Sequence, residues 1–236
     1  MKKKLIYIVT ILIGTMGLTL IGCSHNDKKN DEFINIKIEQ EEGYDEEKVE
    51  PIFKYSEIPE EIKEKMLGKS MPKDTNISFD DLAYIKLTCY GFDKEDHIGE
   101  MVVDKRLAEE VVDIFKELYE KKYPIEKVKL IDEYNADDKS SMNDNNTSAF
   151  CYRTIKGTDK LSNHGKGRAI DINPFQNPHV IGDTTNPEEA CSYIDRTKED
   201  IGIIRQGDDC YNAFVSRGWT WGGHWKNPDY QHFEKK

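Results

Sequence analysis

Residues 162–171 of this chain read Ser-Asn-His-Gly-Lys-Gly-Arg-Ala-Ile-Asp. The glycines between His164 and Asp171 let the backbone turn, so that both side chains can approach one point. His232 follows much later, within Asp-Tyr-Gln-His-Phe-Glu at residues 229–234. Two imidazoles and one carboxylate are a ligand set that zinc accepts, and three protein ligands leave the fourth tetrahedral position open, as in catalytic sites. The sequence therefore predicts a Zn²⁺ site formed by His164, Asp171 and His232.

A fourth residue suits the chemistry of such a site. Bound zinc lowers the pKa of its water to about 7, which creates a hydroxide nucleophile near neutral pH. A base must still take the proton and pass it to a leaving group. Asp229, three residues before His232, is the candidate for this role. The spacing of His164 and Asp171 is weak support by itself, because six histidines in 236 residues produce such pairs by chance.

The combined pattern is more specific. Ser-x-His-x-x-Gly-x-Ala-x-Asp followed by Asp-x-x-His-Phe-Glu resembles the zinc D-alanyl-D-alanine carboxypeptidase and L-alanyl-D-glutamate endopeptidase family of bacterial cell-wall peptidases. The flanking stretches 146–153, 157–162, 169–174 and 218–223 are similar to those of its larger members. The resemblance covers roughly residues 80–236. It implies an α+β fold, a small and mostly antiparallel sheet flanked by helices, which is shared with the hedgehog signalling domain.

The resemblance also implies roles for individual residues. His164, Asp171 and His232 would bind zinc, and Asp229 would be the acid/base. Arg153 would stabilise the oxyanion near the scissile carbonyl, where a fixed guanidinium is worth several kcal/mol. Ser162 would hydrogen-bond the substrate.

The implied activity is hydrolysis of an amide in the peptidoglycan stem peptide by attack of metal-bound water. The cleaved bond, D-Ala-D-Ala or L-Ala-D-Glu, stays open at this point. The alternative is a non-catalytic, zinc-binding cell-wall lipoprotein on the same fold. The presence of Asp229 favours catalysis, because a non-catalytic relative could lose the base and keep the ligands.

Periodicity predicts several elements around these motifs. Residues 82–90 have strand character, and residues 104–122 carry an apolar stripe at helical spacing, with Asp104 as a cap and Pro124 preventing continuation. A short strand is expected at 128–131 and a helix at 208–217. Strand edges are expected at 219–221 and 232–234.

The N-terminus predicts export. Three lysines precede an apolar run that ends in Leu-Ile-Gly-Cys, which resembles a lipoprotein signal cleaved before Cys23. We therefore expect a signal peptide at 1–22, an acidic tether at 23–50 that begins with lipidated Cys23, an N-terminal extension at 51–79 that packs on the domain, and a peptidase domain at 80–236. The expected location is the outer face of the cell membrane, with a lipid anchor and a monomeric state.

The net charge of the chain restricts the classes of molecule that it can bind. The chain has 34 basic and 45 acidic residues, and the first 22 residues contain three of the basic and none of the acidic ones, so the net charge without them is near −14. Such a protein would repel nucleic acid. The expected partner is instead the peptidoglycan stem peptide.

Four cysteines remain if Cys23 is lipidated. Cys191 with Cys210 is the preferred disulfide if one forms, and small buried thiols are the equal alternative. Cys151, two residues before Arg153, could face a metal, but we expect it to point away. Two other side chains, Arg168 and His179, are expected to be solvated.

Overall fold

The computed structural model describes residues 50–155 and 157–236 of the chain. The predicted signal peptide, Cys23 and nearly all of the predicted tether lie outside the described residues. Within the described part, no helix has the length and apolar character needed to cross a membrane.

The first sheet is built on strand β2 (Leu82–Tyr90), which has the bounds predicted from the sequence. It pairs in antiparallel register with β1 (Phe53–Ser56) on one edge and with β3 (Asp96–Asp104) on the other. Most side chains of β2 are buried on both faces of the sheet. That explains why the strand reads as a nearly continuous apolar run rather than as an alternating one.

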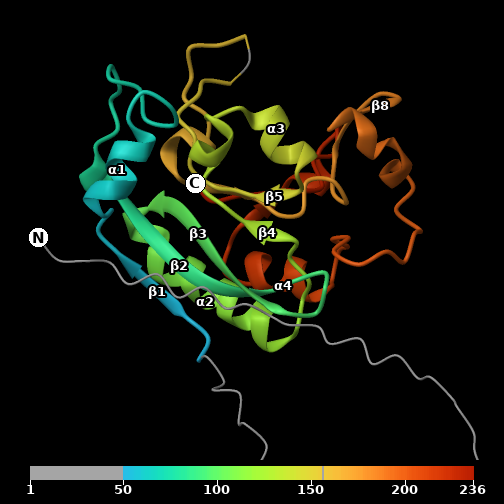
Figure 1. Ribbon diagram of the computed structural model, residues 1–236. Coiled ribbons are helices and arrows are strands. Elements are labelled where there is room, and N and C mark those ends of the chain that lie inside the picture. Colours follow the sequence, from blue (N-terminus) through green and yellow to red (C-terminus); the bar gives the residue numbers. More distant parts are fainter. Residues whose placement is uncertain (1–49, 156) are drawn as a thin grey trace, which may run out of the picture. The chain divides into compact units, whose positions relative to one another are not determined.

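Helix α2 (Ala108–Glu120) covers one face of this sheet (Figure 1). Its apolar stripe lies in the main core, with Val111, Ile114 and Leu118 fully buried. The predicted helix at 104–122 is longer than the observed one, because its first turn is the 3₁₀ helix η2 (Lys105–Leu107). Asp104 caps that turn by accepting a hydrogen bond from the backbone N–H of Arg106 at 3.0 Å.

The second sheet has the order β6–β10–β9 and holds the sequence motifs. Its strands are β6 (Ala169–Asp171), β10 (His232–Glu234) and β9 (Thr220–Trp221), paired antiparallel. Phe233 of β10 is fully buried and stacks on Phe214 of helix α4 (Asp209–Val215) with ring centroids 4.2 Å apart. The helix and strand edges predicted here are confirmed, because apolar residues at their spacing form the core.

A second core lies under the N-terminal segment. Helix α1 (Glu60–Met66) buries Ile62 and Met66 in a cluster that also contains Phe150. The backbone N–H of Tyr152 donates to the carbonyl oxygen of Ser70 at 2.9 Å. Residues before 80 therefore support the segment that leads to Arg153.

The remaining elements are short. The strand predicted at 128–131 is confined to β4 (Lys127–Val128), which pairs with β5 (Asn146–Thr147), the one parallel pair among the described strands. The others are α3 (Asp138–Asn143), the hairpin β7 (His179–Ile181) and β8 (Thr184–Asn186), and the 3₁₀ helices η1 (Phe79–Asp81), η3 (Ile131–Tyr134), η4 (His164–Lys166), η5 (Glu188–Ile194) and η6 (Gly222–His224).

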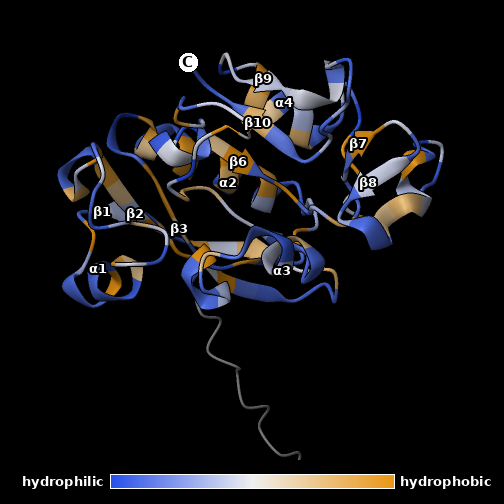
Figure 2. Ribbon diagram, turned by 90° about the horizontal axis from the view of Figure 1, so that it is seen from above, coloured by the Kyte–Doolittle hydropathy of each residue, from blue (hydrophilic) through white to orange (hydrophobic). Residues whose placement is uncertain are grey.

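Figure 2 shows the hydrophobic strand β6 in the interior and hydrophilic loops at the periphery. The predicted α+β class, with small antiparallel sheets flanked by helices, is confirmed.

The structure contradicts the preferred disulfide between Cys191 and Cys210. Cys89, Cys151, Cys191 and Cys210 are all free thiols, and Cys210 is fully buried while Cys191 is exposed. Cys210 lies in α4 on the inner face that packs into the main core, which removes it from the surface where Cys191 lies. The alternative of small buried thiols holds for three of the four.

Candidate metal centre

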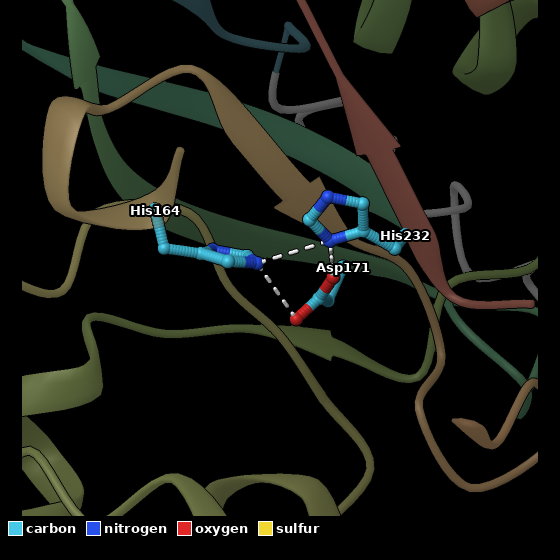
Figure 3. A group of neighbouring side chains, drawn as sticks. All are labelled: His164, Asp171 and His232. Carbon is cyan, nitrogen blue, oxygen red and sulfur yellow. Dashed lines mark hydrogen bonds and ion pairs between the residues drawn. The ribbon is translucent and has the colours of Figure 1, made fainter. Parts of the chain in front are cut away.

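His164, Asp171 and His232 converge in the second sheet (Figure 3). His164 Nε2 lies 3.1 Å from Asp171 Oδ2, and His232 Nδ1 lies 3.0 Å from Asp171 Oδ1. The two imidazole nitrogens are 3.2 Å apart. The register of β6 against β10 places His232 directly opposite Asp171, and η4 supplies His164. All three side chains are buried.

The turn between His164 and Asp171 depends on Gly167. Its φ is +69°, in the left-handed region, and a Cβ atom there would lie 2.4 Å from the backbone nitrogen of Asp104. Any other residue would therefore be strained and would collide with the end of β3. The expectation that Arg168 is solvated is wrong, because its Nε donates to Asp104 Oδ2 at 2.8 Å. That ion pair fixes the motif to β3.

Hydrogen bonds on the outer nitrogens orient both imidazoles. His164 Nδ1 lies 2.7 Å from the carbonyl oxygen of Ala149, so this nitrogen must carry the proton and donate it. His232 Nε2 lies 3.2 Å from Glu234 Oε2, and Asn163 donates to the same oxygen at 2.7 Å. In the neutral rings, the lone pairs of His164 Nε2 and His232 Nδ1 therefore point toward each other and toward Asp171.

This donor set fits a metal cation. Two lone pairs and a carboxylate that face one another repel unless a positive charge lies among them. Ligand atoms about 2.0–2.2 Å from a tetrahedral zinc are separated by roughly 3.3–3.6 Å, close to the contacts observed here. Although burial opposes a charge on the ring, hydrogen bonds to Asp171 and Glu234 raise the pKa of His232 to about 10. Metal binding must therefore displace a proton from this site.

Asp229 lies beside this group, and one of its carboxylate oxygens lacks a hydrogen-bond partner among the described residues. Its Oδ1 is buried and has no hydrogen bond within the described part of the chain. Its backbone N–H donates to the carbonyl oxygen of Gly222 at 3.0 Å, and a Cβ on Gly222 would lie 2.6 Å from the Asp229 carbonyl oxygen. Burial, reinforced by the negative charge of Asp171, raises the pKa of Asp229 to about 7. A carboxyl group with such a pKa can accept and return a proton near neutral pH.

Arg153 reaches the edge of the same centre from the segment that precedes His164. Its Nη1 donates to Asp138 Oδ1 of α3 at 2.7 Å, and the negative charge of Asp171 also acts on its pKa. Ser162 Oγ accepts a hydrogen bond from the backbone N–H of Gly165 at 3.0 Å, which closes the turn before η4. Its role in substrate binding stays a prediction. Cys151 is buried and does not belong to the group of metal-binding side chains.

Some residues of the site carried no decisive sequence signal. Asp138 and Ala149 lie at unremarkable positions in the chain and act through contacts that only folding creates. His179 was expected to be solvated, yet it is half-buried and is the bridge partner of Asp229. Trp225 is 40% exposed, and its ring centroid lies 5.2 Å from that of His232.

Comparison with protein families agrees with this geometry. Residues 156–235 match the family model described as D-alanyl-D-alanine carboxypeptidase. The match supports a zinc peptidase of this type and does not single out one member of the carboxypeptidase family. The matched segment contains the three candidate ligands and Asp229, whereas Arg153 and Ala149 precede it. Neither the curated proteins nor the solved structures gave a significant match.

Proposed function

We propose that this protein is a zinc-dependent carboxypeptidase that removes the terminal D-alanine from peptidoglycan stem peptides ending in D-Ala-D-Ala. The match to the D-alanyl-D-alanine carboxypeptidase family supports the substrate class. The observation that carries the catalytic part is the buried, unpartnered Asp229 Oδ1 beside the group of His164, Asp171 and His232. A non-catalytic metal site gains nothing from an unpaired carboxylate oxygen, which costs free energy when buried.

His164, Asp171 and His232 would hold the zinc ion. When bound, zinc would act as a Lewis acid that polarises a carbonyl group and lowers the pKa of water. The protein's own contribution is to hold the two imidazoles by their outer nitrogens, through Ala149 and Glu234. This restraint keeps the lone pairs directed inward without reorganisation when substrate arrives.

Asp229 is the proton carrier in this proposal. The free Oδ1 accepts a proton from the attacking water and returns it to the departing amine. Burial and the negative charge of Asp171 raise the pKa of Asp229, which makes its carboxylate a stronger base than an exposed aspartate. Close packing of Gly222 against its backbone limits movement of the carboxylate.

Arg153 stabilises the negative charge that develops on the carbonyl oxygen. Asp138 holds one nitrogen of the guanidinium, and the side chain stays 32% exposed, which leaves other N–H groups free to donate to substrate. A fixed cation in a partly dry site needs little reorganisation as charge develops.

The proposed location rests on the sequence alone. We propose that residues 1–22 direct export, that Cys23 carries the lipid anchor, and that the acidic segment after it tethers the site within reach of the wall.

The test uses the mature chain, zinc-loaded, with purified peptidoglycan and with acetylated peptides ending in D-Ala-D-Ala. The expected product is free D-alanine, measured by mass spectrometry, and Asp229→Asn should release at least about 100-fold less while keeping its zinc. New N-terminal D-glutamate ends would instead identify an L-alanyl-D-glutamate endopeptidase. Stoichiometric zinc with no product at all would support the non-catalytic alternative and refute this proposal.

A further inference from the structure

A short antiparallel ladder joins the β7 segment to the strand-like segment that carries Asp229. The backbone N–H of Val180 donates to the carbonyl oxygen of Pro228 at 2.7 Å, and that of Tyr230 donates to Pro178 at 3.4 Å. His179 and Asp229 are the bridge partners between these two bonds, so they form a non-hydrogen-bonded pair. Side chains of such a pair project from the same face, with Cβ atoms about 4.5–5.5 Å apart.

That shared face is the face of the metal centre. The charges of His164, Asp171 and His232 act on the pKa of Asp229. Two of these groups, Asp171 and His232, also act on His179, whose pKa is lowered chiefly by burial. The imidazole of His179 therefore lies on the same face of the ladder as the carboxylate of Asp229.

The ladder is held in place by a buried guanidinium. Arg196 stacks on the ring of Tyr230 at 4.2 Å and donates to Asn177 Oδ1 at 2.8 Å. It also donates to the carbonyl oxygens of Gln176 and Ile204 at 2.7 and 2.9 Å. These contacts tie the segment just before His179 to Tyr230, the residue that follows Asp229. The imidazole therefore has a fixed position, as a binding residue requires.

The ring of His179 is not used by the fold. Within residues 50–155 and 157–236 its nitrogens have no hydrogen-bond partner and are not among the buried unpaired atoms. The side chain is half-buried, so part of it packs against the protein and part stays accessible to a ligand. An N–H donor beside the active carboxylate is available to a ligand.

We propose that His179 is a specificity-determining residue that donates a hydrogen bond to the C-terminal carboxylate of the substrate. This inference rests on the proposed function. Because Asp229 returns its proton to the departing amine, a side chain next to Asp229 faces the residue that is released. In a substrate ending in D-Ala-D-Ala, that residue carries the terminal carboxylate. The donor offsets the repulsion between this carboxylate and Asp229.

The kinetic test compares an acetylated peptide ending in D-Ala-D-Ala with the same peptide bearing a C-terminal amide. His179→Ala should raise KM for the acid about 10- to 100-fold, since a hydrogen bond to a charged group is lost, while kcat changes little. For the amide the same variant should change KM less than about threefold. His179→Gln keeps an N–H donor and should recover part of the loss. Equal losses on both peptides would overturn the inference.

A binding measurement separates this inference from the proposed function. In an Asp229→Asn background, calorimetry should show about tenfold weaker binding of the acid when His179→Ala is added, at unchanged zinc content. His97→Ala is the matched control, because His97 is exposed on β3 and pairs with Asp93. If the wild type releases D-alanine but the acid binds equally well with and without His179→Ala, the inference is overturned and the proposed function stands. Absence of both release and binding would overturn the proposed function and the inference with it.

Discussion

His164 Nδ1 lies 2.7 Å from the backbone carbonyl oxygen of Ala149, and this contact joins the two halves of the candidate site. His164 belongs to the segment that matches the carboxypeptidase family, whereas Ala149 precedes that segment. The carbonyl fixes which nitrogen carries the proton, so the Nε2 lone pair points to Asp171. The residues that precede the matched segment thus contribute to the candidate metal site.

Metal content is the first prediction. The purified protein should bind one zinc per chain, and His164→Ala or His232→Ala should remove stoichiometric zinc, because only two ligands would remain. Removing zinc with a chelator should lower the Tm, since a ligand bound to the native state alone stabilises it. Elemental analysis and thermal unfolding measure both effects. His97→Ala should retain full zinc, and a His164→Ala protein that also retains it would contradict this assignment.

Glu234 should tune the affinity for zinc. Its Oε2 faces His232 Nε2 at 3.2 Å, so the carboxylate orients the ring and raises its basicity. Glu234→Gln should weaken zinc binding about 10- to 100-fold, measured by competition with a chromophoric chelator. Glu189→Gln, at an exposed position, is the matched control. Equal affinities for the two variants would show that Glu234 does not support the ligand.

Arg153 and Asp138 should affect turnover without affecting zinc. Arg153→Ala should lower kcat about 10²–10³-fold, because the developing negative charge loses its cation. Asp138→Ala should lower kcat roughly tenfold, since the guanidinium loses its 2.7 Å anchor, and Asp138→Glu should recover part of it. Lys139→Ala, the next residue on α3, should have little effect. If Asp138→Ala raised KM alone, Asp138 would not position Arg153 for the transition state.

Asp104 should make stability depend on acid pH. Burial alone would raise its pKa, but hydrogen bonds from Arg106 and Arg168 outweigh this and hold the pKa at about 2. An unfolded aspartate titrates near pH 4, so the ionised carboxylate stabilises the native state above that pH by about 2 kcal/mol. This contribution is lost as the pH falls from about 4 toward 2.

The check is urea unfolding at pH 5 and pH 2.5 with a chelator present, so that metal release does not contribute. Wild type should lose about 2 kcal/mol more of its unfolding free energy than Asp104→Asn over this interval. Asp74→Asn, at an exposed position, should behave like wild type. A wild-type loss no larger than that of Asp104→Asn would refute the role of Asp104.

The sequence predicted the elements whose residues carry a periodic apolar pattern. Strand β2 and helices α2 and α4 follow from burial at regular spacing, and Pro124 marks the end of α2 because its ring forbids helix continuation. Strands β5, β6, β7 and β8 are two or three residues long and were not predicted. Their residues carry too little apolar pattern, because pairing with partners elsewhere in the chain creates them.

By itself, the sequence determined the chemical types at the candidate site: two imidazoles and two carboxylates, with glycines that permit a tight turn between His164 and Asp171. Ligand chemistry and φ preferences are local properties, so residue identity is enough to specify them. The tertiary structure alone decided which groups orient and surround those residues. Ala149, Asp138 and His179 approach the site through backbone carbonyls, ion pairs and strand register between segments far apart in the chain. Such contacts depend on packing of the whole domain, and no local pattern in the sequence encodes them.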